Sequence, residues 1–196
     1  LWPDLSEFGP GERFATGFTN AAGKPAEVFS SFRQETVLRH FRWMEEAGID
    51  GVFLQRFAVD VFGNTGRRHN DAVLAHVREG ARASGRTFAM MYDLSGLGAE
   101  QMGRVMEDWR RLSGEMHVTD DPRYLRHHGK PLVAVWGVGF NDQRKYTVGE
   151  CRRLVEFLRE QGCAVMLGVL SSACARALPV AAPPSAVVRA ALAGPH

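Results

Sequence analysis

Residues 87–93 read Thr87-Phe-Ala-Met-Met-Tyr-Asp93, a nearly unbroken apolar run that ends in a carboxylic acid. Three more short runs of this kind begin at positions 51, 131 and 163. Continuous apolarity is typical of parallel strands covered on both faces, whereas strands with one face in water alternate apolar and polar residues. The pattern therefore predicts four buried strands, over residues 51–57, 87–93, 131–136 and 163–169.

Segments with a helical period precede each predicted strand. Apolar residues recur three or four positions apart within 37–44, 73–81, 102–112 and 154–158. The last helix opens with Thr147-Val-Gly-Glu150, the spacing of a capping box. Gly48 and Gly162 stand where helices end before the next strand. After a loop over residues 1–33, helices and strands therefore alternate, which predicts an α/β fold with a parallel sheet.

Two architectures share this alternation, an open doubly wound sheet and a (β/α)8 barrel. A complete barrel takes eight strands and about 250 residues, whereas this chain has 196 residues. We therefore expect a partial barrel over residues 1–170, with the open doubly wound sheet as the alternative. Residues 171–196 are rich in Ala and Pro and hold no acidic or aromatic residue. They are expected to form a tail that is disordered or translated out of frame.

The charge balance argues against several classes of partner. Lys and Arg number 24 against 22 Asp and Glu, a formal charge of +2, which provides little field to attract nucleic acid or an anionic membrane. No apolar run approaches the roughly 20 residues of a membrane helix, and the first residues show no signal-peptide pattern. We expect a soluble chain without nucleic-acid or membrane partners and leave its compartment open.

No motif for a metal or an organic cofactor stands out. The cysteines and histidines lack the spacing of a metal site. The stretch Gly137-Val-Gly-Phe-Asn-Asp142 lacks the third glycine of a dinucleotide fingerprint, and the next helix begins only near Thr147. The chain also has no P-loop and no G-x-S-x-G nucleophile elbow. We therefore expect neither a metal nor a cofactor.

Candidate ligand-binding residues lie at the C-terminal ends of the predicted strands, because ligands gather at that end of parallel strands. Gln55 and Arg56 offer an amide and a cation suited to a polyhydroxylated or anionic ligand. Alternatively, Arg56 pairs with a neighbouring carboxylate such as Asp93 and ties two strands together. Asp93 either serves a functional site or caps the helix that follows its strand. Trp136 precedes glycines and predicts either a stacking platform for sugars or a core residue.

Several motifs, in order along residues 1–169, resemble bacterial proteins of the glycoside hydrolase family 71/99-like group, some of which are labelled xylosidase/arabinosidase. The motifs are Leu1-Trp-Pro-Asp-Leu-Ser-Glu-Phe8, Val28-Phe-Ser-Ser31, His40-Phe-Arg-Trp-Met44, Gly48-Ile-Asp-Gly-Val-Phe-Leu-Gln-Arg-Phe57, Met91-Tyr-Asp-Leu-Ser-Gly96 and Val135-Trp-Gly-Val-Gly-Phe140. Residues 171–196 have no counterpart in the resemblance.

The resemblance implies a (β/α)8 barrel that acts on glycosidic bonds of a polysaccharide or glycan. The four strands would be numbers two to five, in a fragment that lacks strand one and strands six to eight. In the related family 99 enzymes two glutamates on a later loop form the catalytic pair, and no matching Glu-x-x-Glu follows a strand here. The candidate acids present suit substrate positioning, or the support of positioning groups, instead: Asp4, Asp60, Asp93 and Asp142.

These observations lead to one functional hypothesis and one alternative. We expect a glycoside hydrolase-like partial barrel with carbohydrate as its partner, and little or no activity because two facing carboxyl groups are not evident. Catalytic residues are unassigned, with Asp93 as the candidate. The alternative is a standalone, non-enzymatic α/β ligand-binding module, and exposed strand edges would favour self-association in a partial barrel. Residues expected to line the sugar cleft are Trp2, Asp4, Gln55, Arg56, Tyr92, Asp93, Trp136 and Asn141.

Overall fold

The computed structural model describes residues 2–140 and 143–169. Its helices and strands run in the order η1 (Pro10–Glu12), β1 (Arg13–Thr19), β2 (Pro25–Phe29), α1 (Gln34–Glu46), β3 (Gly51–Phe57), η2 (Asp60–Phe62), α2 (Asn64–Ser84), β4 (Thr87–Asp93), α3 (Met102–Arg110), the π-helical turn η3 (Arg111–Glu115), η4 (Val118–Asp120), β5 (Arg126–His127), β6 (Lys130–Val138), α4 (Val148–Glu160) and β7 (Ala164–Val169). The predictions for residues 171–196 and for Asn141 and Asp142 lie outside the described residues.

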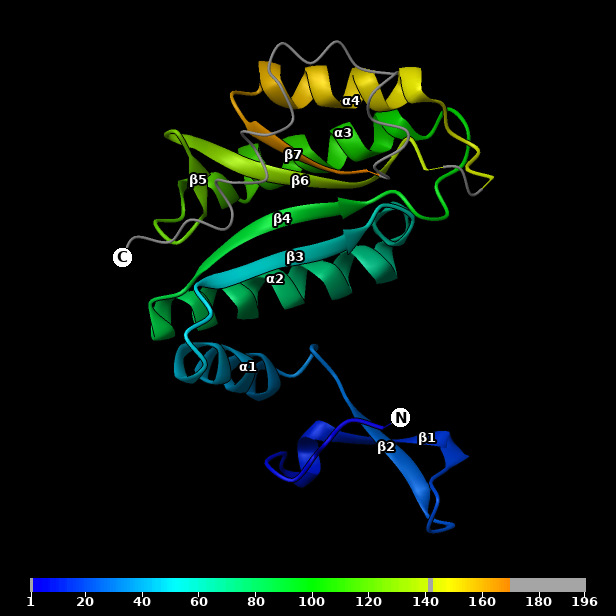
Figure 1. Cartoon of the computed structure of the whole chain (residues 1–196), viewed down its shortest axis with the longest axis vertical. Helices are drawn as coiled ribbons and strands as arrows, with labels where there is room; N and C mark the ends of the chain where they lie inside the picture. Colours follow the sequence, from blue (N-terminus) through cyan, green and yellow to red (C-terminus); the bar gives the residue numbers. More distant parts are fainter. Residues whose placement is uncertain (1, 141–142, 170–196) are drawn as a thin grey trace.

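The main sheet confirms the predicted α/β class. Strands β3, β4, β6 and β7 are parallel and lie side by side in the order of the chain, while the short β5 pairs antiparallel with the start of β6. A doubly wound sheet reverses its strand order at a switch point, whereas a barrel adds each strand to the same edge. The unreversed order is therefore that of a partial barrel, and β3 and β7 do not meet within the described residues (Figure 1).

The predicted helices are also present, with the expected ends. Thr147 accepts a hydrogen bond from the Glu150 N–H while the Glu150 side chain bonds back to Thr147, so the predicted capping box of α4 is confirmed. Gly48 and Gly162 adopt positive φ angles of 70° and 79° just after α1 and α4. This left-handed conformation is accessible to glycine at little cost, and it turns the chain from each helix into the next strand.

The helices pack on one face of the sheet. Alternate residues of the strands, such as Met90, Tyr92 and Val135, are buried in one core with side chains of α2, α3 and α4. The other alternate residues point away from the helices, and large apolar side chains among them are exposed by 40–44%: Phe53, Phe57, Trp136 and Met166. The strands were expected to be covered on both faces. Among the described residues only one face is covered, and the other is an open apolar face.

Residues 1–33, expected as a loop, instead include the antiparallel hairpin of β1 and β2. The segment docks on α1 through aromatic rings and one ion pair. Phe8 stacks on Phe29 with ring centroids 5.2 Å apart, and its ring meets Trp43 of α1 edge-on at 5.7 Å. Arg39 of α1 contacts Glu12 at 2.6 Å. The hairpin therefore lies against α1, on the far side of that helix from the sheet (Figure 1).

Helices α1 and α2 approach closely because Gly80 lacks a side chain. A Cβ atom at Gly80 would lie 2.4 Å from Cδ2 of the buried Phe41 ring. A glycine inside a helix normally costs stability relative to alanine. Here the absence of a methyl group instead permits the contact between the two helices.

We predict that Gly80→Ala lowers the free energy of unfolding by about 1–3 kcal/mol, because overpacking forces Phe41 and the helices apart. Gly103 of α3 is the matched control, since a Cβ there meets no atom within 4 Å. Gly103→Ala should raise the free energy of unfolding by roughly 0.5–1 kcal/mol. Urea unfolding of both variants measures the two effects, and an equal response to both substitutions would contradict the close helix contact.

Candidate functional site at the strand ends

Trp136 forms a platform on the open face of the sheet. It is the register partner of Gly168 on β7, and a Cβ atom at Gly168 would lie 2.1 Å from Cε3 of the indole. The six-membered ring of the indole therefore occupies the space that a side chain at position 168 would fill. Phe140 meets the indole nearly edge-on at 5.2 Å, and Trp136 is 44% exposed. The indole is thus held from one side and open to a ligand.

Asp93 lies beside Trp136, because the two residues are register partners on β4 and β6. Its Oδ2 accepts a hydrogen bond of 2.7 Å from Nε2 of Gln55, and its Oδ1 accepts one of 2.8 Å from the Ser95 N–H. Asp93 is buried. The carboxylate holds the turn after β4 and does not cap a helix, because the next helix, α3, begins only at Met102 with Gln101 as its N-cap. The functional interpretation of Asp93, which faces the open side of the sheet, stays a prediction.

Arg56 and Tyr92 point to the opposite face, because successive side chains of a strand alternate. Arg56 is 1% exposed and donates hydrogen bonds of 2.8 and 2.9 Å to the carboxylate of Asp108, and one of 2.9 Å to Asp71. The Tyr92 hydroxyl donates to Asp108 at 2.8 Å. Arg56 therefore pairs with carboxylates, as the alternative interpretation expects. The partners are Asp71 and Asp108 of the helices rather than Asp93, which Gln55 bonds, so the pairing joins a strand to helices and not two strands.

The buried network shifts the pKa values of Tyr92 and Arg56. Burial raises the pKa of Tyr92 well above its ordinary value, so the hydroxyl remains a donor. Burial opposes the charge on Arg56, but the hydrogen bonds and negative charge of Asp108 outweigh it and raise the pKa of the guanidinium. The network links the end of β3 to α2 and α3, and its side chains lie on the helix side of the sheet, not on the open face.

The remaining predicted site residues lie apart from Trp136 or outside the described residues. Trp2 lies against Phe18 of β1, with ring centroids 6.1 Å apart, and the Asp4 carboxylate accepts a hydrogen bond from the Ser6 N–H. Both therefore belong to the N-terminal segment docked on α1, away from the ends of β4 and β6 (Figure 1). Asn141 lies outside the described residues. The described site thus brings together Gln55, Asp93 and Trp136.

The loop after β6 adds residues that sequence reasoning missed. Nη1 of Arg144 lies 2.9 Å from the Tyr146 hydroxyl and 3.3 Å from Oγ of Ser95, and its guanidinium lies 5.1 Å from the centre of the Phe140 ring. The Tyr146 hydroxyl donates to the Gly137 carbonyl at 2.8 Å. The sequence signal for these residues was the long loop between Trp136 and the capping box at Thr147. The later residues of such a loop can fold back over the strand ends.

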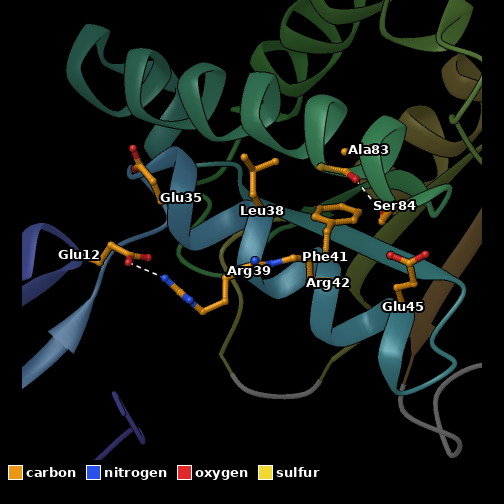
Figure 2. Close-up of a pocket in the computed structure, with 10 residues that line it drawn as sticks. Glu12, Glu35, Leu38, Arg39, Phe41, Arg42, Glu45, Ala83 and Ser84 are labelled. Atoms are coloured by element: carbon orange, nitrogen blue, oxygen red, sulfur yellow. Dashed lines mark hydrogen bonds and ion pairs between the residues drawn. The ribbon is translucent and has the colours of Figure 1, made fainter. Parts of the chain in front are cut away.

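A cavity of about 650 Å³ lies elsewhere, between α1, α2 and Glu12 (Figure 2). Phe41 and Leu38 form part of its wall, and Arg39 reaches across to Glu12. Burial opposes ionisation of Glu12, but hydrogen bonds from the Gly9 N–H, Arg39 and Thr36 lower the pKa of the carboxyl below its ordinary value. This cavity lies where the N-terminal segment meets helices α1 and α2, and it is separate from the strand-end site.

Within residues 2–140 and 143–169, no three His, Cys, Asp or Glu side chains are grouped so that they could hold a metal ion. In the same residues no helix is both long enough and apolar enough to cross a membrane. The groups of the strand-end site that a ligand can contact are aromatic rings, an amide, a carboxylate and a guanidinium. Together these groups can stack on a flat apolar surface and hydrogen-bond a polar rim.

Comparison with known proteins yields structural neighbours only. No protein-family model matches the chain, and no curated protein matches it. Two solved structures of the GH99 endo-α-mannosidase from Bacteroides thetaiotaomicron are similar, one of them in complex with BIS-TRIS-propane. The complex has a TM-score of 0.43 and 20% sequence identity over 62% of this chain and 33% of that chain. The other has a TM-score of 0.40, 20% identity, and coverage of 62% and 32%. This chain spans about a third of their length.

We predict that Asp108→Asn lowers the free energy of unfolding by about 3 kcal/mol, because it removes a charge that compensates the buried guanidinium of Arg56. Asp121→Asn is the control, since its partner Arg78 has a side chain 35% exposed and an ion pair of that kind contributes less than about 1 kcal/mol. Thermal or urea unfolding tests the difference. Equal losses in the two variants would contradict the role given to Asp108.

Proposed function

We propose that the chain is a glycoside hydrolase-like module that binds an oligosaccharide or polysaccharide at the ends of β4 and β6. The observation that carries this proposal is the placement of Trp136, whose indole rests over Gly168 and is open on the sheet face that the helices leave uncovered. A sugar ring would stack on the indole. Its hydroxyl groups would then lie near the Asp93 carboxylate and the Gln55 amide.

The chemistry of the site suits a sugar ring. A pyranose ring presents C–H groups on its face and hydroxyl groups at its rim, so it needs a flat aromatic surface bordered by hydrogen-bonding groups. Phe140 and Arg144 extend the border on the side of the loop. The family resemblance supports the same proposal, because two of its motifs contain Asp93 and Trp136. Its xylosidase/arabinosidase labels favour pentose-containing chains as the ligand.

Hydrolysis requires more than the described residues of this site provide. Glycosidases place two carboxyl groups across the bond they cleave, one as acid and one as base or nucleophile. Both oxygens of Asp93 already accept hydrogen bonds, from Gln55 and from Ser95. Asp60, another candidate, is an exposed residue at the start of η2. We therefore assign Asp93 to substrate positioning and propose binding with little or no turnover.

We predict that Trp136→Ala weakens oligosaccharide binding at least about tenfold, a loss of about 1.4 kcal/mol, because the stacking surface disappears. Trp2→Ala is the matched control, since Trp2 is 42% exposed but lies against Phe18 on the hairpin. Calorimetric titration with xylo-, arabino- and manno-oligosaccharides measures the affinities. Equal affinities of the two variants and the parent chain would contradict the proposed site, as would a lack of binding to every oligosaccharide.

We further predict that the chain releases nitrophenol from aryl xylosides, arabinosides and mannosides no faster than buffer does. The physical reason is that a single positioning carboxylate does not supply an acid and a base together. Absorbance measurements over hours test this expectation. Robust hydrolysis that Asp93→Asn abolishes would show that Asp93 is catalytic and would overturn the assignment.

A further inference from the structure

The two outer strands of the parallel sheet are unpaired within the described residues. β3 pairs with β4 alone, and β7 pairs with β6 alone. Unpaired edges expose backbone N–H and C=O groups that can join another strand. The edges belong to strands of similar length, since β3 has 7 residues and β7 has 6. Both strands also run in the same direction.

Helix α1 extends the helix layer beyond β3. It packs against α2, on the side of α2 that faces away from β4 (Figure 1). In a barrel each helix covers the gap between two neighbouring strands. α1 therefore stands where it would cover the junction between β3 and a strand added to its free edge.

The open face has the character of a barrel interior. Phe53 of β3 and Met166 of β7 are each 40% exposed on this face, as is Phe57. Side chains that point to the same side of a closed eight-stranded barrel fill its interior. A second sheet packed against this face would bury these apolar side chains away from water.

We infer that two copies of this chain associate around a two-fold axis and close one eight-stranded parallel barrel. In this dimer β7 of each copy pairs with β3 of the other, and α1 covers the junction. The second copy fits because it provides a parallel edge, a matching apolar face and four described parallel strands, which together with the first four make the eight that close a small barrel. Two-fold symmetry forms both junctions at once and pairs the outer edges of both β3 and β7.

The dimer also extends the site, a consequence that rests on the function proposed above. All strands of a parallel barrel end on the same side. The mouth of the barrel would therefore be bordered by two copies of Trp136 and two copies of the Asp93–Gln55 pair. A saccharide chain would meet a platform contributed by each copy, which a single copy does not provide.

Light scattering after gel filtration of the full 196-residue chain tests association. The chain has a mass of 21.7 kDa, and the dimer predicts twice that mass at micromolar concentration. Phe53→Lys should give the monomer mass, because it places a charge in the barrel interior. Phe18→Lys is the control, since Phe18 is 69% exposed on the hairpin, and it should remain dimeric. Met166→Lys serves as a second interior variant, and circular dichroism checks that each variant folds.

Hydrogen exchange locates the contact. Amides of β3 and β7 should exchange more slowly at concentrations where the dimer forms than after dilution, because edge pairing protects them. A monomer at all concentrations, larger open-ended assemblies, or a dimer without protection at both edges would each overturn the inference. Saccharide binding by a monomer would leave the proposed function intact, whereas a closed dimer that binds no saccharide would overturn the function alone.

Discussion

The alternation of side chains along four parallel strands determines what this molecule can present to a ligand. Because the described helices cover one face of the sheet, every second strand residue enters the core and the residues between them face outward. Arg56 and Tyr92 fall on the helix side, where Asp108 accepts hydrogen bonds from both. Their neighbours Gln55 and Asp93 fall on the open side, where they bond each other. The candidate site follows from this division.

The two faces differ in how their polar groups are satisfied. On the helix side a buried arginine is compensated by two aspartates from two helices, since an unpaired charge there would cost several kcal/mol. On the open side the carboxylate of Asp93 has two hydrogen-bond partners and borders the exposed indole of Trp136. The first arrangement holds the strand ends in place. The second offers a stacking surface and hydrogen-bonding groups with which a ligand can interact.

Much of the fold could be predicted from sequence, because apolar runs and helical periods are local signals. The four strands and four helices lie where the patterns place them, and the glycines at positions 48 and 162 end helices as expected. The hairpin of β1 and β2 was missed because its strands carry no continuous apolar run. Arg13-Phe-Ala-Thr-Gly-Phe-Thr19 contains a glycine and polar residues, and its docking on α1 depends on Phe8, which precedes it.

The site was predictable only in part, because the residues that contact Arg56 and Trp136 come from distant positions in the sequence. Strand alternation already forbids Gln55 and Arg56 from sharing one face, and applying it would have separated them. That Arg56 pairs with Asp108 rather than Asp93 depends on where α3 lies. The placement of Trp136 depends on Gly168, a residue on another strand. The indole N–H signals of the four tryptophans, followed by NMR during titration with an oligosaccharide, test directly whether Trp136 is the stacking surface. If it is, the Trp136 signal shifts while those of Trp2, Trp43 and Trp109 stay in place; a shift confined to Trp2 or Trp43 would contradict this role.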